Sequence, residues 1–172
     1  VAVNGPTSTA INTAIGLSAT ASDPDAGDVL AYAWDFGDRT VSTTNNASVS
    51  KQWSTAGSYV VRCTVSDMRG GVASDSLLVT VGSPTVFAIR GRVLDGAAGV
   101  HGVRIHNGQS GSAYRGTFTE SDGTYILGNL ATGSVTVSAI SPLHTLTTSF
   151  TNPVTIGPDA SNKDFIATRR DE

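Results

Sequence analysis

The chain has 172 residues, of which 15% are charged, and its formal net charge is −3 at pH 7. A weakly acidic chain lacks the basic surface of a nucleic-acid-binding protein, and no stretch approaches the roughly 18 consecutive apolar residues of a membrane span. A single cysteine excludes a disulfide framework and a zinc site built from cysteines. The length allows one domain of ordinary size or two small ones.

Apolar residues alternate with polar or small residues along most of the chain. This period of two places one set of side chains in the core and the other toward solvent, as in a β-strand. No window shows the period of a helix of ordinary length. The sequence therefore predicts an all-β fold of short strands and tight turns. The alternating segments are 30–36, 59–66, 76–81, 89–93, 125–127 and 135–139.

A domain boundary is predicted at Gly82-Ser83-Pro84-Thr85. One strand ends before this segment, and a new apolar run begins at Val86. Each half then holds about 80 residues, which is enough for one modest sandwich core. We expect two tandem β-sandwiches, residues 1–82 and 86–168, joined by this short linker.

Four motifs in the first half resemble the PKD (polycystic kidney disease) domain. The resemblance covers residues 1–82 and implies an immunoglobulin-like sandwich, found as an accessory module in secreted enzymes and surface proteins. Alternation places Trp34, Phe36 and Cys63 in its core. The motifs are Ser22-Asp23-Pro24-Asp25, Tyr32-Ala33-Trp34-Asp35-Phe36-Gly37-Asp38, Ala56-Gly57-Ser58-Tyr59-Val60-Val61 and Val65-Ser66-Asp67.

The turn after the predicted core strand carries two carboxylates. Gly37 is expected to adopt a positive φ, while Asp35 and Asp38 accept backbone N–H bonds. The alternative is that the two carboxylates form an acid–base pair. Arg39 stands where the family usually has glycine, so we expect this turn to differ in shape.

The second half is similar to the carboxypeptidase regulatory-like domain over residues 86–168. The resemblance implies a transthyretin-like sandwich without catalytic activity, which accompanies a separate peptidase domain in some proteins. Asp122-Gly123 fits a tight hairpin turn between paired strands. The motifs are Ile89-Arg90-Gly91-Arg92-Val93-Leu94-Asp95, Val100-His101-Gly102-Val103-Arg104-Ile105, Thr119-Glu120-Ser121-Asp122-Gly123-Thr124-Tyr125 and Leu130-Ala131-Thr132-Gly133-Ser134-Val135-Thr136-Val137.

The sequence shows no constellation of catalytic residues, so we expect that the chain is not an enzyme. There is no Gly-x-Ser-x-Gly elbow and no phosphate-binding loop. His101, His106 and His144 are expected to be exposed, and their spacing does not suit a metal site. Tyr114 is the one aromatic residue expected to be exposed, in the glycine- and serine-rich stretch 108–116.

A calcium site is predicted in the first half from Asn4, Asp23, Asp25 and Asp67. Asp23 and Asp25 lie two residues apart in a loop, and Asp67 ends a predicted strand at a pole of the sandwich. Carboxylate and amide oxygens suit calcium, and some PKD-like domains of collagen-degrading enzymes bind calcium with similarly placed residues. The alternative is a set of ordinary Asx turns, and Asp28 is left open between the two.

The expected function follows from the two resemblances. We expect a fragment of a larger secreted or cell-surface protein, resembling the C-terminal accessory region of secreted bacterial metallopeptidases. Its role would be a monomeric, stabilising spacer or scaffold for the catalytic domain of the same chain. The alternative is a substrate-binding module for an extracellular protein or polysaccharide; neither role involves nucleic acid or a membrane span.

Overall fold

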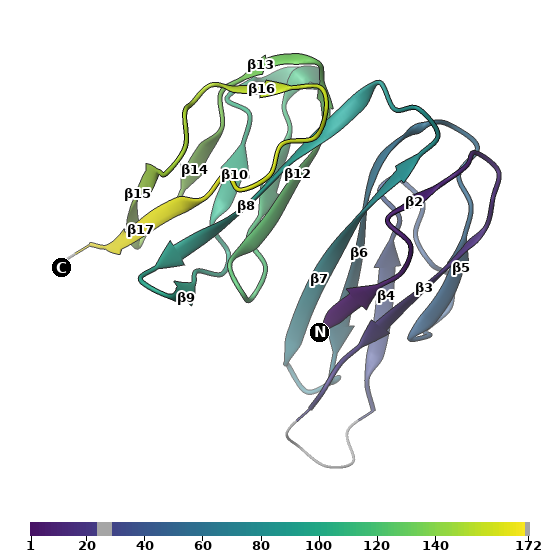
Figure 1. Ribbon diagram of the computed structural model, residues 1–172. Helices are drawn as coiled ribbons and strands as arrows, with labels where there is room; N and C mark the ends of the chain where they lie inside the picture. Colours follow the sequence, from purple (N-terminus) through teal and green to yellow (C-terminus); the bar gives the residue numbers. More distant parts are fainter. Residues whose placement is uncertain (24–28, 171–172) are drawn as a thin grey trace. The chain divides into compact units, whose positions relative to one another are not determined.

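The computed structural model describes residues 1–23 and 29–170, which form two compact units, Val1–Pro84 and Thr85–Glu172 (Figure 1). Strands dominate both units, and the one helical element of the described chain is the 3₁₀ turn η1, Gly111–Ala113. The prediction of an all-β fold is therefore confirmed. Among these residues, no helix has the length and apolar character needed to cross a membrane.

The first unit consists of two sheets. One has the strand order β1-β3-β5 and is antiparallel, and the other has the order β2-β7-β6-β4, with β2 parallel to β7. The strands are β1 (Ala2–Asn4), β2 (Ser8–Thr9), β3 (Ile15–Thr20), β4 (Ala31–Asp35), β5 (Ser48–Lys51), β6 (Gly57–Ser66) and β7 (Val72–Val81).

The core of the first unit lies between these two sheets. Leu17 of β3 and Trp34 of β4 both belong to it, as do Val61, Cys63 and other residues of β6 and β7. The indole N–H of Trp34 donates to the carbonyl oxygen of Asn46, so the polar atom of this large side chain keeps a partner after burial. Alternation thus predicted the inward residues of β4 and β6 correctly.

The second unit contains three sheets. Their strand orders are β11-β10-β14, β12-β8-β17-β15 with β9 added to β8, and β13-β16. The strands are β8 (Val86–Asp95), β9 (Ala98–Gly99), β10 (Arg104–His106), β11 (Gly116–Phe118), β12 (Thr124–Ala131), β13 (Gly133–Val135), β14 (Ser138–Ile140), β15 (His144–Thr148), β16 (Val154–Ile156) and β17 (Phe165–Arg169).

The three sheets of the second unit share one core. Ile105 of β10 lies in it with Tyr125 of β12 and Phe165 of β17. The Tyr125 hydroxyl donates to the carbonyl oxygen of Lys163 at 2.6 Å. The pKa of this phenol is raised, because burial and then the charge of Asp164 disfavour the phenolate.

The turn at Asp122-Gly123 differs from the prediction of a hairpin between paired strands. Gly123 has a φ of +81° and Asp122 Oδ1 accepts the Thr124 N–H at 2.9 Å, so the local turn chemistry is as expected. However, the strand before the turn, β11, pairs with β10, whereas the strand after it, β12, pairs with β8. The chain therefore changes sheet at this turn.

Candidate functional site

Asp23 and Asp67, two of the four residues predicted to bind calcium, lie at the same end of the first unit. Asp23 is in the loop that leads from β3 into β4, and β4 begins at Ala31. Ala31 lies opposite Ser66, the last residue of β6, which Asp67 follows directly. The topology thus brings these two carboxylates to one pole.

The carboxylate of Asp67 is already engaged by its own turn. Its Oδ1 accepts the backbone N–H groups of Arg69 at 2.7 Å and Gly71 at 2.9 Å. These bonds, with that from Arg69 the strongest, lower the pKa of the Asp67 carboxyl. Asp67 therefore fulfils the alternative, turn-forming role considered from the sequence.

Asn4 lies farther from this pole. The register of β1 and β3 places Asn4 opposite Ser18, whereas Ala2 lies opposite Thr20, where β3 ends. Asn4 therefore lies two strand residues, or about 7 Å, away from the end of β3. The side-chain amide of Asn4 donates to the carbonyl oxygen of Ala2 at 3.3 Å.

The remaining predicted ligand, Asp25, lies outside the described residues, as does Asp28. Within residues 1–23 and 29–170, no three His, Cys, Asp or Glu side chains are grouped so that they could hold a metal ion. The described residues alone thus do not supply a calcium-binding set, and the four-residue site stays a prediction.

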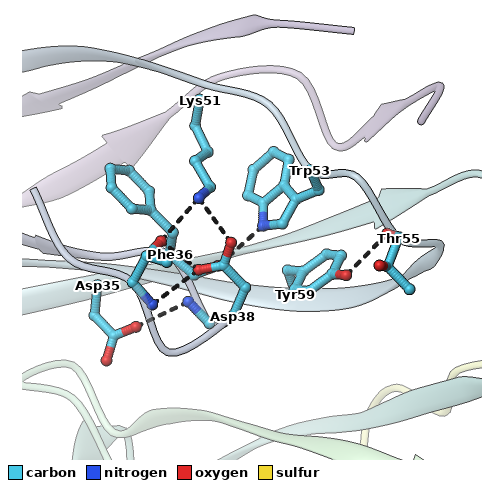
Figure 2. Close-up of polar contacts among 9 residues, drawn as sticks. Asp35, Phe36, Asp38, Lys51, Trp53, Thr55 and Tyr59 are labelled. Carbon is cyan, nitrogen blue, oxygen red and sulfur yellow. Dashed lines mark hydrogen bonds and ion pairs between the residues drawn. The ribbon is translucent and has the colours of Figure 1, made fainter. Parts of the chain in front are cut away.

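Asp35 and Asp38 act in the turn after β4, as the sequence predicted. Asp35 Oδ1 accepts the N–H of Gly37 at 2.8 Å, and Gly37 has a φ of +74° (Figure 2). Asp38 Oδ1 accepts the N–H of Thr40 at 3.0 Å. Both carboxylates therefore satisfy backbone donors that the turn would otherwise leave without a partner.

Lys51 closes this turn with an ion pair that the sequence analysis missed. Its Nζ lies 2.7 Å from Asp38 Oδ2, and the two side chains are only 14% and 20% exposed. The same Nζ lies 4.9 Å from the ring centre of Phe36 and 5.7 Å from that of Trp53. Burial alone would raise the pKa of Asp38, but hydrogen bonds from Lys51 and Thr40 lower it below its usual value.

The aromatic side chains beside Lys51 are fixed by hydrogen bonds of their own (Figure 2). The indole N–H of Trp53 donates to the carbonyl oxygen of Phe36 at 3.3 Å. The hydroxyl of Tyr59 donates to the backbone carbonyl oxygen of Thr55 at 2.8 Å. The rings of Trp53 and Tyr59 stack with their centres 5.3 Å apart. Each of these polar groups has a partner, so this cluster has the character of a structural element.

Arg39, the departure from the PKD pattern, adopts a φ of +69°. This left-handed conformation favours glycine and is costly for a residue with a Cβ. The chain therefore holds a strained arginine where the family usually has glycine, and the expectation of a differently shaped turn stays a prediction.

Cys63 is fully buried, as alternation predicted. Burial and then the charge of Asp75 raise the pKa of its thiol to about 11, so the thiolate is scarce at neutral pH.

The prediction of three exposed histidines is wrong for two of them. His101 is exposed, but His106 and His144 lie on strands β10 and β15 and are half-buried, because neighbouring side chains pack against them.

The outward face of the sheet β11-β10-β14, called the β10 face below, carries side chains of mixed character. Arg104 of β10 lies opposite Phe118 of β11 on one side and Ile140 of β14 on the other. The two apolar side chains are 54% and 52% exposed. The β10 face thus presents a cation between two solvent-exposed apolar groups.

Tyr114 packs onto the β10 face and is half-buried, which corrects the expectation of an exposed tyrosine in a loop. Its hydroxyl lies over Gly116, where a Cβ would collide with the phenol. Its ring stacks against His106, with the ring centres 6.2 Å apart. Arg104 donates to the Tyr114 hydroxyl from Nε at 3.1 Å and from Nη2 at 2.9 Å.

A shallow depression of about 480 Å³ borders Arg104 and Tyr114. Within it, the Nδ1 atom of His106 accepts the N–H of Gly108 at 3.1 Å, while its buried Nε2 atom has no hydrogen-bond partner among the described residues. Burial and then the charge of Arg104 lower the pKa of His106, which favours the neutral ring. The depression is lined by Arg104, His106, Gly108, Gln109, Ser110, Gly111, Tyr114 and Ile140.

Sequence reasoning missed Arg104 and Phe118 as candidate site residues. Alternation within 104–106 and 116–118 could have placed both on an outward face. Their proximity, however, depends on the pairing of β10 with β11, which short-range patterns do not specify.

Comparison with known proteins finds similarity for the first unit. Residues 1–81 match the model of the PKD domain. Over 81 residues the chain is 36% identical to collagenase ColA of Bacillus cereus, and over 79 residues it is 32% identical to collagenase ColA of Clostridium perfringens. These alignments cover 47% and 46% of this chain but only 8% and 7% of the two collagenases.

Among solved structures, the alignment with the Bacillus anthracis TIE protein covers 98% of this chain and 40% of the TIE protein chain. The sequence identity is 13% and the TM-score is 0.39.

Proposed function

We propose that this chain is a non-catalytic accessory region of a larger extracellular hydrolase, in which it acts as a stabilising spacer or scaffold beside a catalytic domain of the same chain. The observation that carries this proposal is the match of residues 1–81 to the PKD domain, together with collagenase relatives of which the matched segment is less than a tenth. A module of this kind contributes through its fold and surface, and not through a reacting group.

For the second unit we propose a carboxypeptidase regulatory-like domain, covering residues 86–168. The four motifs named above and the separate all-β core of this unit support the assignment. The glycines of two motifs also have structural roles. A Cβ at Gly91 would collide with the backbone of Lys163, and one at Gly123 would collide with the carbonyl oxygen of Val93.

The test of the accessory role is a hydrolysis assay with the purified chain. We expect no turnover of gelatin, casein or a chromogenic ester above that of the His106→Ala and Asp35→Asn variants. Turnover by the wild-type chain that either substitution abolishes would overturn the proposal, since it would show a catalytic group.

The gene that encodes these 172 residues provides a second test, of the parent's class. If the parent is a metallopeptidase, we expect the same reading frame to encode a zinc-peptidase motif such as His-Glu-x-x-His. A catalytic signature of another hydrolase class in that frame would retain the accessory role and contradict the peptidase assignment.

We also propose that calcium binds at the pole of the first unit, through Asp23, Asp25 and Asp67, with Asn4 as a further ligand. The placement of Asp23 and Asp67 at one end of the sandwich supports this. Calcium bound to the folded state raises the melting temperature by mass action. We therefore expect melting at higher temperature in calcium than in chelator, and no such difference for Asp25→Ala. Equal melting of the wild-type chain in both conditions would contradict the proposal.

A second candidate function is binding of an extracellular polymer by the second unit. The specific observation in its favour is the β10 face, where an arginine lies between two exposed apolar side chains beside a shallow depression. The collagenase relatives of the first unit suggest collagen as one polymer, which gelatin represents in the experiment below.

A further inference from the structure

The β10 face combines apolar exposure with a positive charge. Phe118 and Ile140 flank Arg104 in the register of the sheet, and more than half of each apolar side chain is exposed to solvent. Exposed apolar side chains that are grouped together and bordered by polar groups are a typical feature of a surface that binds a ligand. Arg104 and Ile140 also line the depression.

The cation of this face is held in position before any ligand arrives. Arg104 donates to the Tyr114 hydroxyl through Nε and Nη2, and its guanidinium lies 5.4 Å from the centre of the Tyr114 ring. Tyr114 is fixed in turn by the space over Gly116 and by stacking on His106. A group that is already ordered loses little conformational entropy when it binds a ligand.

Hydrogen-bonding capacity remains on both partners of this contact. The Nη1 atom of Arg104 and the hydroxyl proton of Tyr114 have no hydrogen-bond partner among the described residues, so both are available to a ligand. A guanidinium edge and a phenol O–H are donors, and they favour an acceptor oxygen of a ligand.

The charge of Arg104 is not compensated by the residues around it. No carboxylate lines the depression, whose remaining polar side chains, Gln109 and Ser110, are neutral. Arg104 forms no ion pair with any residue of 1–23 or 29–170. The β10 face is therefore complementary to an anionic ligand.

From these contacts we infer that the β10 face binds an acidic polysaccharide, with the carboxylate of a uronic acid unit on Arg104 and the apolar face of a sugar ring on Phe118. A shallow depression with neutral hydrogen-bonding side chains suits a flat, hydroxylated chain. An extended peptide would instead need a long free strand edge, and both outer strands of this sheet have only three residues. The inference deepens the polymer-binding candidate and does not depend on the spacer role.

The experiment is native gel electrophoresis of the full chain through gels that contain a dissolved polymer, with EDTA present to exclude bridging by calcium. We expect polygalacturonate or alginate to retard the wild-type chain, and methyl-esterified polygalacturonate, which lacks the negative charge, to retard it far less. Arg104→Gln should weaken the retention about tenfold or more, as expected for a hydrogen bond to a charged group.

Two further variants make the test specific. Phe118→Ser should also weaken retention, because it removes the exposed ring. Arg169→Gln removes an exposed arginine from β17, outside the β10 face, and should bind like the wild type. Unchanged circular dichroism melts for all three variants would show that the fold persists, since each site is on the surface.

The inference is overturned if neither acidic polymer retards the wild-type chain, or if Arg104→Gln binds as tightly as the wild type. Retention by gelatin but not by the acidic polymers would also overturn it, while leaving the broader polymer-binding proposal intact. Retention by none of the polymers would contradict both.

Discussion

Each unit of this protein places a cation against aromatic rings, but the two cations have different surroundings. Lys51 in the first unit contacts Phe36 and Trp53 and is paired with Asp38 at 2.7 Å. Arg104 in the second unit contacts Tyr114 and donates to its hydroxyl, and no described carboxylate lines its depression. The first arrangement is closed by an ion pair, whereas the second remains open to a ligand.

The two clusters make similar contacts with aromatic rings. What distinguishes the structural element from the candidate binding site is whether the cation is paired with an anion. A cation whose charge and donors are satisfied within the chain contributes to stability and has little to offer a ligand. A cation that is held in place yet lacks an anion contributes less to stability and more to recognition. Substitutions in the two units should therefore have opposite profiles.

The largest effect is expected for Trp34→Ala in the core of the first unit. Trp34 is 1% exposed, and truncation of a buried aromatic side chain costs roughly 3–5 kcal/mol of unfolding free energy. Chemical denaturation followed by tryptophan fluorescence measures this, because both tryptophans, Trp34 and Trp53, lie in the first unit and Trp53 remains in the variant. A variant as stable as the wild type would show that this side chain is not a core anchor.

Removing the cation of the closed cluster should have a smaller but clear effect. In Lys51→Met, the half-buried carboxylate of Asp38 loses its partner, and we expect the unfolding free energy to fall by about 1–3 kcal/mol. The control is the double variant Lys51→Met/Asp38→Asn, which should recover part of this loss, because the unpaired charge is then gone. No recovery would mean that the ion pair itself is not the source of the stabilisation.

The same cluster predicts the response to acid. The pKa of Asp38 is lower in the folded state than its ordinary value of 3.8. Its contribution to stability is therefore present above pH 4 and is lost as the pH falls through the folded pKa. Melting of the first unit between pH 5 and pH 2 should depend less steeply on pH in Asp38→Asn than in the wild type, and equal slopes would contradict the assignment.

The smallest effect is expected at Arg39, where relief of backbone strain should stabilise the first unit. Arg39→Gly should raise the unfolding free energy by about 0.5–1 kcal/mol, because the cost of a left-handed residue exceeds the entropy that glycine loses on folding. Arg39→Ala retains the strain and is the matched control. A gain of the same size in both variants would assign the effect to the charge of Arg39 and not to its backbone.

The sequence predicted those features that depend on neighbouring residues. Alternation identified the burial of Trp34 and Cys63, and glycine and aspartate chemistry identified the turns at Gly37 and Gly123. These features follow from local geometry, which a short stretch of sequence contains.

Features that depend on distant pairing could not be predicted in the same way. The two strands beside Gly123 join different sheets because Thr124 pairs with Arg92, more than thirty positions earlier. Likewise, Tyr114 is half-buried because Gly116 has no side chain to collide with its phenol and because Arg104 of β10 donates to its hydroxyl. Strand register decides both, and it is set by the whole core.

Lys51 has an ion pair, whereas Arg104 has none within the described chain. This contrast is tested most directly by the unfolding free energies of Lys51→Met and Arg104→Gln, each followed by amide hydrogen exchange in its own unit. We predict a loss of about 1–3 kcal/mol for Lys51→Met and of less than about 1 kcal/mol for Arg104→Gln, because Arg104 is exposed and has no ion pair within the described chain. A loss at Arg104→Gln as large as that at Lys51→Met would contradict the account and make the β10 face a second structural cluster.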